Sequence, residues 1–168
     1  IIGSLDPKFY GGLQNSLRYR NLYLDVFFEF RKQTGANYLH QVYTNMPAGN
    51  LGNLPQTFNE RWQQPGDQFF LQKLTSGSST PAARAARNFV NSDAAYEDAS
   101  YIRLKNVSLS YNLENSFLNK LKVRSLRIFL HAQNVLTITN YKGHDPETQS
   151  FYSLPPLKTI VAGILVNL

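Results

Sequence analysis

Three histidines, His40, His131 and His144, are the side chains best suited to bind a metal or to move a proton near neutral pH. They are far apart in the sequence, and only His144 has a neighbouring carboxylate, that of Asp145. A protein metal site needs three or four ligands, so two adjacent residues do not define one. The sequence therefore predicts no metal and no cofactor, and His131, which alternates with Gln133, is interpreted as a polar residue of a strand.

Two carboxylates, Asp25 and Glu29, lie four residues apart and could form a general acid–base pair. On a strand this spacing separates them by ~13 Å. The paired carboxylates of glycosidases are only about 5–9.5 Å apart, so we expect ion pairs with Arg18 or Arg127 instead. The sequence contains no cysteine and no G-x-S-x-G, Walker or G-x-G-x-x-G motif. It predicts a protein that is not an enzyme.

The composition narrows the class of protein further. The 168 residues include 17 basic and 11 acidic ones, a net charge of +6, but the basic residues form no stripe, so no nucleic-acid partner is predicted. Arg84 and Arg87 are interpreted as one solvated helix face. A charged fraction of 17% with 13% aromatic residues excludes a disordered tail. No run of 18 apolar residues is present, as a membrane-spanning helix would require.

Alternation of apolar and polar residues predicts the elements that position these side chains. Five strands are expected near residues 13–19, 22–31, 101–113, 123–135 and 159–168. The first two form a hairpin around a two-residue turn, in which Asn21 supplies the positive φ that such turns need. Tyr19 then faces Leu22 and Leu13 faces Phe28, so the paired apolar residues share one face.

Each predicted strand has an apolar face and a polar face. The apolar set includes Leu24, Val26, Phe28, Leu109, Ile128, Leu130, Ile164 and Val166. The polar set comprises Arg18, Asp25, Glu29, Ser108, Asn112, Arg127 and His131. Tyr19 and Tyr111 belong to the apolar face, close to the end of the strands where the short turns lie.

The connections between the strands alternate in length. Long ones, near 32–100 and 136–157, alternate with short ones at 20–21 and 114–122. In an up-and-down sheet the two long connections lie at one end of the strands and the short ones lie at the other end.

The first long connection contains one predicted helix. Thr80 is placed to cap its N-terminus, Pro81 occupies the first helical position, and an Ala/Arg-rich body continues to about Val90.

Two interpretations fit this pattern. One is a soluble β-domain whose apolar face is its core, which could bind carbohydrate through loop aromatics such as Trp62. The other is a transmembrane β-barrel with the apolar face toward lipid and the polar face toward a wet lumen. Charged residues in mid-strand, unequal connections and tyrosines near one edge favour the barrel. Five strands cannot close a barrel, because even small ones need about eight, so the remaining strands must come from other residues.

The segment Tyr96-Glu-Asp-Ala-Ser-Tyr-Ile-Arg-Leu-Lys-Asn-Val-Ser-Leu-Ser-Tyr-Asn-Leu113 resembles the C-terminal part of SusC/RagA-type TonB-linked outer-membrane transporters from Bacteroidetes. Further stretches agree with this family in the same order along the whole chain. They are Ile2-Gly3 with Pro7 and Gly11-Gly12, Tyr19-Arg-Asn-Leu-Tyr-Leu24, Arg61-Trp-Gln-Gln-Pro-Gly-Asp67, Leu126-Arg-Ile-Phe-Leu-His-Ala-Gln-Asn-Val-Leu136, Tyr141-Lys-Gly-His-Asp-Pro146 and the terminal strand. Asn21 and Leu168 depart from the family, which favours Gly and an aromatic residue there.

The resemblance implies that residues 1–168 are the C-terminal segment of one all-β domain, the last five strands of a barrel of twenty-two. In that family the barrel encloses an N-terminal plug, and the outer loops meet a SusD-like surface lipoprotein that acts as a lid. TonB energises the import of glycans or peptides across the Gram-negative outer membrane. The expected partners are thus this lipoprotein at the edge with long loops, the rest of the barrel and plug, TonB, and lipid or lipopolysaccharide outside.

Overall fold

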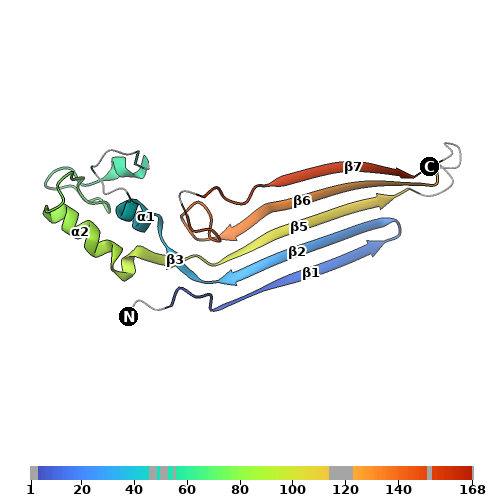
Figure 1. The fold of residues 1–168 in the computed structure, drawn as a ribbon, viewed down its shortest axis with the longest axis horizontal. Coiled ribbons are helices and arrows are strands. Elements are labelled where there is room, and N and C mark those ends of the chain that lie inside the picture. Colours follow the sequence, from blue (N-terminus) through green and yellow to red (C-terminus); the bar gives the residue numbers. More distant parts are fainter. Residues whose placement is uncertain are drawn as a thin grey trace. The chain divides into compact units, whose positions relative to one another are not determined.

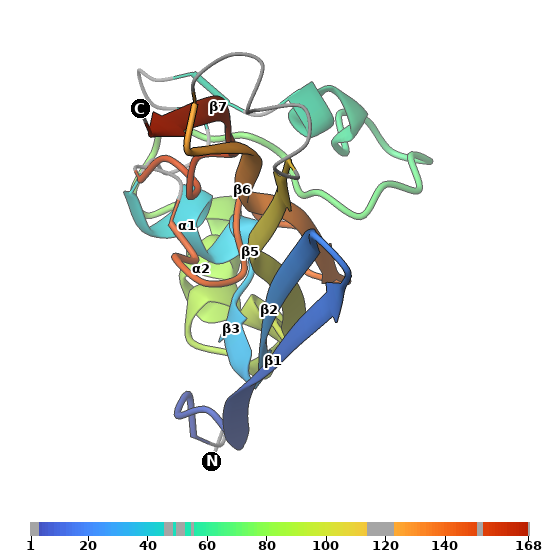
Figure 2. The same ribbon diagram turned by 90° about the vertical axis from the view of Figure 1, so that its right-hand side faces the viewer.

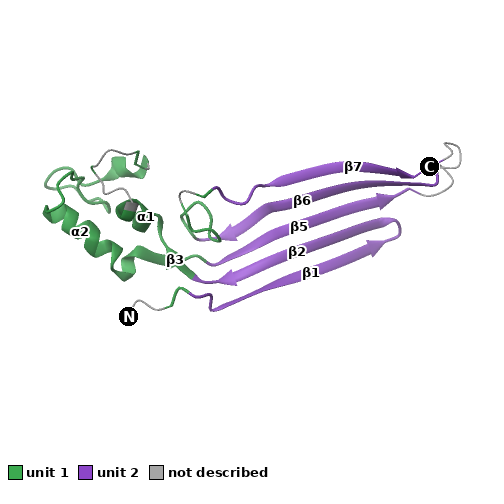
Figure 3. Ribbon diagram, in the orientation of Figure 1, with its two compact units in different colours: residues 1–5, 34–99, 141–153 green, residues 6–33, 100–140, 154–168 purple. Residues whose placement is uncertain are grey.

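A computed structural model describes residues 4–45, 49, 53–54, 56–113, 123–150 and 153–167. Its contacts divide the chain into two compact units, drawn in purple and green in Figure 3. The purple unit, here the sheet unit, comprises residues 6–33, 100–140 and 154–168. The green unit, here the loop unit, comprises residues 1–5, 34–99 and 141–153.

The sheet unit is one antiparallel sheet of five strands in the order β1-β2-β5-β6-β7 (Figure 1). The strands are β1 Phe9–Tyr19, β2 Leu22–Lys32, β5 Tyr101–Asn112, β6 Ser125–Thr139 and β7 Thr159–Asn167. Figure 2, viewed from the end of the sheet that carries the first turn, shows the same order. Neighbours in the sheet are consecutive among these strands, so the sheet is up-and-down, and β1 and β7 form its open edges.

The β1–β2 hairpin has the predicted register, with Tyr19 opposite Leu22 and Leu13 opposite Phe28. The prediction for its turn is wrong in one respect. The positive φ, 53°, belongs to Arg20 and not to Asn21. A positive φ at the first turn residue alone is the pattern of type II′ turns, whose twist also suits a hairpin.

Strand β1 begins at Phe9, four residues earlier than the alternation predicts. The alternation of apolar and polar residues cannot be recognised at Gly11 and Gly12, because glycine has no side chain. In the structure two aromatic rings cover them: a Cβ on Gly11 would lie 2.7 Å from Phe30 Cζ, and one on Gly12 would lie 2.6 Å from Phe27 Cε2. The glycines therefore belong to the strand, and phenylalanines from β2 fill the space above them.

Two register shifts change the alternation in the middle of the sheet. Strand β5 has one extra residue, Lys105, relative to β2, and β6 has one more than β5 around Asn134, whose φ is 53°. These are β-bulges, in which an extra residue reverses the faces on one side of it. Relative to β2, β6 has gained two residues between Ala132 and Leu136, so its even-numbered residues stay on one face. Leu136 and Ile138 therefore lie opposite Leu104 and Ile102 on the apolar face, and β6 continues to Thr139 instead of ending at 135.

The strand ends place both long connections at one end of the sheet, where Arg31, Tyr101 and Thr139 are mutual neighbours. The opposite end carries the 20–21 turn and the connection between β5 and β6. Residues 114–122 of that connection lie outside the described part of the chain, as does the last residue of the predicted terminal strand, Leu168.

The loop unit holds regular structure that the sequence predicts only in part. A two-stranded sheet pairs β3 Thr34–Ala36 with β4 Tyr96–Asp98. The helices are α1 Tyr38–Asn45, η1 Gln56–Glu60, α2 Pro81–Val90 and η2 Asp93–Ala95. No helix among the described residues combines the length and apolar character needed to cross a membrane. The core of the unit is formed by Leu39, Val42, Tyr43, Phe58, Leu71 and Ala86.

The second long connection packs into the same unit as the first. Tyr141 donates a hydrogen bond from its hydroxyl to the carbonyl of Ala36, 2.8 Å away, and the amide of Gln41 donates to the carbonyl of Gln149. Burial, with the charges of Glu97 and Asp145, raises the pKa of Tyr141 to about 12, so this hydroxyl stays protonated as a donor. The two long connections thus form one folded unit.

The predicted helix α2 is confirmed, with Thr80 at its N-cap and Pro81 in its first turn. Thr80 Oγ1 accepts a hydrogen bond from the Ala83 amide at 3.2 Å and donates one to the Gly77 carbonyl at 3.1 Å. The hydroxyl of Thr75 lies 2.9 Å from the same oxygen. Thr80 therefore fastens the preceding segment to the start of the helix.

We expect Thr80→Ala to destabilise α2 by about 1 kcal/mol, because the Ala83 amide loses its acceptor. Hydrogen exchange at the Ala83 amide measures this directly. Thr80→Ser retains the hydroxyl and should keep most of the protection. Equal exchange rates in the alanine and serine variants would contradict the assigned cap.

Candidate functional site

The polar face of the sheet unit brings together all the polar residues that the alternation selected. The pairing register aligns them in rows that cross the strands. One row consists of Ser16, Asp25, Ser108, His131 and Val161, one residue from each strand.

The other predicted polar residues lie in neighbouring rows of this face. Arg18 pairs with Tyr23, and Asn112 pairs with Arg127. Glu29 lies closer to the end of the sheet where the long connections leave. The sheet therefore displays the whole predicted set on one surface.

Asp25 and Arg18 have partners other than those expected. Ser16 Oγ donates a hydrogen bond to Asp25 Oδ1 at 2.5 Å, while the Arg18 guanidinium lies 5.0 Å from the centre of the Tyr23 ring. The prediction that Asp25 pairs with Arg18 or Arg127 is wrong. The register explains this, because it sets Ser16 opposite Asp25 and Tyr23 opposite Arg18.

Ser110 is the most deeply buried residue of this central region, with 2% of its surface exposed. It lies between Tyr23 and Phe129 in the same row, and Arg127 Nη2 donates to its hydroxyl at 2.8 Å. The Phe129 ring also covers Gly163, leaving no room there for a side chain. Large aromatic side chains thus pack over small neighbouring residues on this face and shield the backbone beneath them.

Glu29 is the centre of a second group near the long connections. Tyr101 donates its hydroxyl proton to Glu29 Oε1 at 2.6 Å, and Lys105 Nζ lies 3.1 Å from Glu29 Oε2. The predicted partners of Glu29, Arg18 and Arg127, are therefore wrong. Lys105 is the extra residue of β5, and the bulge brings its ammonium group within reach of the carboxylate.

Sequence reasoning missed Arg103, which has 1% of its surface exposed. Its Nε donates to Thr137 Oγ1 at 3.1 Å, and its guanidinium lies 5.2 Å from the centre of the Tyr101 ring. Simple alternation from Val107 assigns Arg103 to the apolar face. The signal for the correct assignment is the change of parity in β5, where apolar Leu104 is even-numbered and Val107 is odd-numbered.

The opposite face of the sheet is apolar and exposed. Tyr19, Leu22 and Tyr111 form one row close to the first turn, as predicted for the two tyrosines. The other residues assigned to this face share it: Leu24, Val26, Phe28, Leu109, Ile128, Leu130, Ile164 and Val166. Asn15 is a polar exception within it, opposite Val26.

Two of the three histidines, His40 and His131, lie against aromatic rings. The His131 ring centre lies 4.9 Å from that of Phe129, and the His40 ring centre lies 5.6 Å from that of Tyr96. Within the described part of the chain, no cluster of three or more His, Asp or Glu side chains could hold a metal ion.

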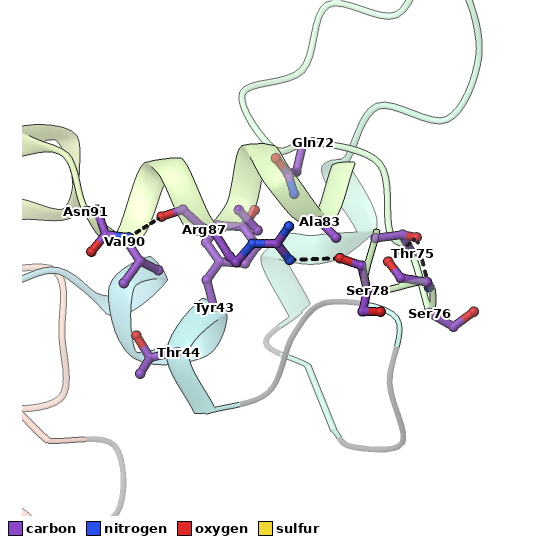
Figure 4. A pocket seen from close by; sticks show the side chains of 12 residues that line it. Tyr43, Thr44, Gln72, Thr75, Ser76, Ser78, Ala83, Arg87, Val90 and Asn91 are labelled. Carbon is purple, nitrogen blue, oxygen red and sulfur yellow. Dashed lines mark hydrogen bonds between the residues drawn. The ribbon is translucent and has the colours of Figure 1, made fainter. Parts of the chain in front are cut away.

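The loop unit contains a pocket of about 420 Å³ (Figure 4). Helix α1, helix α2 and the segment 72–78 line it. Tyr43 and Ala86 contribute apolar surface, and hydroxyl and amide groups surround them. Arg87 is the one charged residue of the described lining, and its Nη1 donates to the Ser78 carbonyl at 2.8 Å.

No protein-family model matches the chain. Two curated proteins of Formosa agariphila are similar to most of it. TonB-dependent receptor P3 is 34% identical over 147 residues, which cover 88% of this chain and 13% of the receptor. TonB-dependent receptor P39 is 27% identical over 152 residues, covering 88% of this chain and 14% of the receptor. The chain spans about a seventh of the length of these relatives, and both are receptors, not enzymes.

Solved structures agree with the sequence relatives. A chain of the RagAB peptide importer in its closed-closed state superimposes with a TM-score of 0.73 at 28% identity, covering 99% of this chain and 18% of the other. The open-open state gives a TM-score of 0.70, also at 28% identity, with coverages of 98% and 18%. With the open up-and-down sheet, these likenesses identify the chain as a C-terminal barrel portion of a SusC/RagA-type TonB-dependent receptor.

Proposed function

We propose that this chain forms one wall of an outer-membrane transporter that imports peptides or glycans with energy supplied through TonB. The observation that carries this proposal is the separation of faces in the sheet unit. One face is apolar apart from Asn15 and is exposed or partly exposed, and the other holds Arg18, Asp25, Glu29 and Arg127. A membrane barrel needs this arrangement, since lipid covers its outside and water its lumen.

The dimensions of the apolar face support a membrane location. On β1 it extends from Tyr19 to Phe9, 11 residues, whose ten steps span ~33 Å along the strand. Strands of membrane barrels tilt by about 40°, so this length projects to ~25 Å, the height of the apolar band in outer-membrane barrels. Tyr19 and Tyr111 lie at one limit of the band, where interfacial aromatic residues are favoured.

Exposure of the apolar face argues against a soluble domain. Leu17, Ile160 and Ile164 have 60%, 68% and 65% of their surface exposed. In water such a face would be a large aggregation-prone patch. In lipid the same side chains are solvated by acyl chains. The carbohydrate-binding alternative, with Trp62 stacking on sugar, would require another layer over this face.

The open edges support assembly into a larger barrel. Strands β1 and β7 contain 11 and 9 residues and no proline, and their outer backbone groups face no other strand of the described sheet. Unpaired backbone groups in hydrocarbon cost several kcal/mol each. We assign their pairing to the remaining strands of the receptor, which would also surround the plug.

We assign the loop unit to the extracellular side, with a SusD-like lipoprotein as its partner. Both long connections leave the sheet at the end opposite the short turn, as the outer loops of such barrels do. The first connection folds around its own core, and hydrogen bonds from Tyr141 to Ala36 and from Gln41 to Gln149 join the second connection to it. Such a folded unit offers a defined surface for a partner.

Adjacent residues of β5 provide a matched test of the membrane assignment. Val107 belongs to the apolar face and Asn106 to the polar face, at nearly the same depth. We expect Val107→Arg to destabilise the membrane-inserted receptor by ~2–4 kcal/mol, and Asn106→Arg to have a much smaller effect. Urea unfolding of the receptor in lipid vesicles measures both.

Asn106 is a better control than Ser110, because Ser110 is buried and accepts a hydrogen bond from Arg127. An arginine at Ser110 would disturb packing whatever surrounds the sheet. If both arginine variants at 106 and 107 were tolerated equally, the apolar face would not contact lipid.

The lipoprotein assignment can be tested by removing the body of the loop unit. Ala36 and Tyr96 pair across β3 and β4, so residues 37–95 can be replaced by Asn-Gly, a two-residue hairpin turn. We expect the shortened receptor to insert into the outer membrane at normal levels but to lose co-purification with its lipoprotein. Undiminished co-purification would place the partner elsewhere on the receptor.

A further inference from the structure

The loop unit contains a pocket, and contact with a lipoprotein would not by itself require one. Its described lining comes from α1, α2 and the segment 72–78 (Figure 4). A volume of about 420 Å³ lies in the lower part of the range of ~300–1,000 Å³ that is typical of small-molecule sites. Its lining also combines apolar side chains with hydroxyl, amide and guanidinium groups, as such sites do.

Tyr43 supplies the first observation that points to a ligand. Its side chain is buried, with 8% of its surface exposed, and its ring packs edge-on against Phe58 and Phe89. Within the described residues no group forms a hydrogen bond with its hydroxyl, although the residue lines the pocket. Burial raises the pKa of Tyr43 to about 12. Its hydroxyl is not among the buried polar atoms that lack a partner, so it is accessible and can donate a hydrogen bond to a group in the pocket.

Arg87 supplies the second observation. Its Nη1 donates to the Ser78 carbonyl, which is the one acceptor recorded for this guanidinium among the described residues. A guanidinium carries five N–H groups, and its Nε–Nη2 edge is the fork that binds a carboxylate through two parallel hydrogen bonds. The described lining contains no Asp or Glu that could occupy this edge.

We propose that this pocket binds the carboxylate-bearing end of a short oligomer, with Arg87 holding the carboxylate and the Tyr43 hydroxyl donating a further hydrogen bond. This inference deepens the proposed transport function and rests on it, because the carboxylate would belong to imported material at the extracellular side. Two sources share the chemistry: the C-terminus of a peptide and the acid group of a uronic sugar.

The test is equilibrium binding to the full receptor in detergent, measured by calorimetry with matched probes. The probes are acetyl-trialanine and its C-terminal amide, and trigalacturonate and its methyl ester. We expect one acid to bind at least tenfold more tightly than its neutral counterpart, and the tighter acid identifies the source. Arg87→Gln should remove about ten- to a hundredfold of that affinity and leave the neutral probe unchanged.

Tyr43→Phe separates binding from folding. It removes a hydroxyl that has no described partner, so the thermal stability of the receptor should be unchanged while affinity for the acid falls severalfold. Arg84→Gln, on the same helix but outside the described lining, is the charge-matched control and should bind as the unsubstituted receptor does.

Two outcomes would overturn the inference: equal affinity for acid and neutral probes, or unchanged affinity in both the Tyr43 and Arg87 variants. Uptake by cells is measured separately. If the receptor supports uptake but the pocket variants do not change binding, the proposed pocket is wrong and the transport proposal still holds. Acid binding that depends on the pocket, in a receptor that supports no uptake, contradicts the transport proposal instead.

Discussion

The backbone hydrogen-bond ladder is the constraint on which the sheet unit depends. A single layer of five strands has no second layer to bury its backbone, so each N–H and C=O directed along the sheet must find its partner in a neighbouring strand. This requirement fixes the register, and the register decides which side chains share a face. Apolar side chains on one face and charged ones on the other are compatible with a single layer only when different solvents cover the two faces.

The polar face shows how a single layer can still be closely packed. Glycine and serine alternate across the strands with aromatic residues, as in the row Tyr23, Ser110 and Phe129, and the rings cover the small neighbours. Similar coverage occurs where Phe27 overlies Gly12 on this face, and where Phe30 overlies Gly11 on the apolar face. Arginines add to it by stacking on rings. The small residues of this face are thus covered by neighbouring rings, although the sheet is a single layer.

Much of this architecture could be predicted from alternation and turn chemistry. The five strands, their order, the hairpin register and helix α2 follow from local patterns. Local patterns do not specify the bulges at Lys105 and Asn134, because a bulge is a property of two paired strands. In the sequence of β5 it appears only as a change of parity, and in β6 the parity does not change. The ion pair of Glu29 and the burial of Arg103 depend on that shift, so both were missed. The pocket brings α1 against the distant stretch that comprises segment 72–78 and α2, and periodicity does not relate these parts of the chain to one another.

The extra residue around Asn134 has a consequence for how such barrels tolerate insertions and deletions. Removing one residue there would turn Leu136 and Ile138 to the polar face and Thr137 and Thr139 to the apolar face, and loss of Asn134 itself would also remove its hydrogen bond to the Leu157 carbonyl. A length change inside β6 can therefore persist only with a compensating change in the same strand or in its partner. Gaps in alignments of these receptors should be placed at bulges in coupled pairs, since an uncoupled gap assigns half a strand to the wrong face of the sheet.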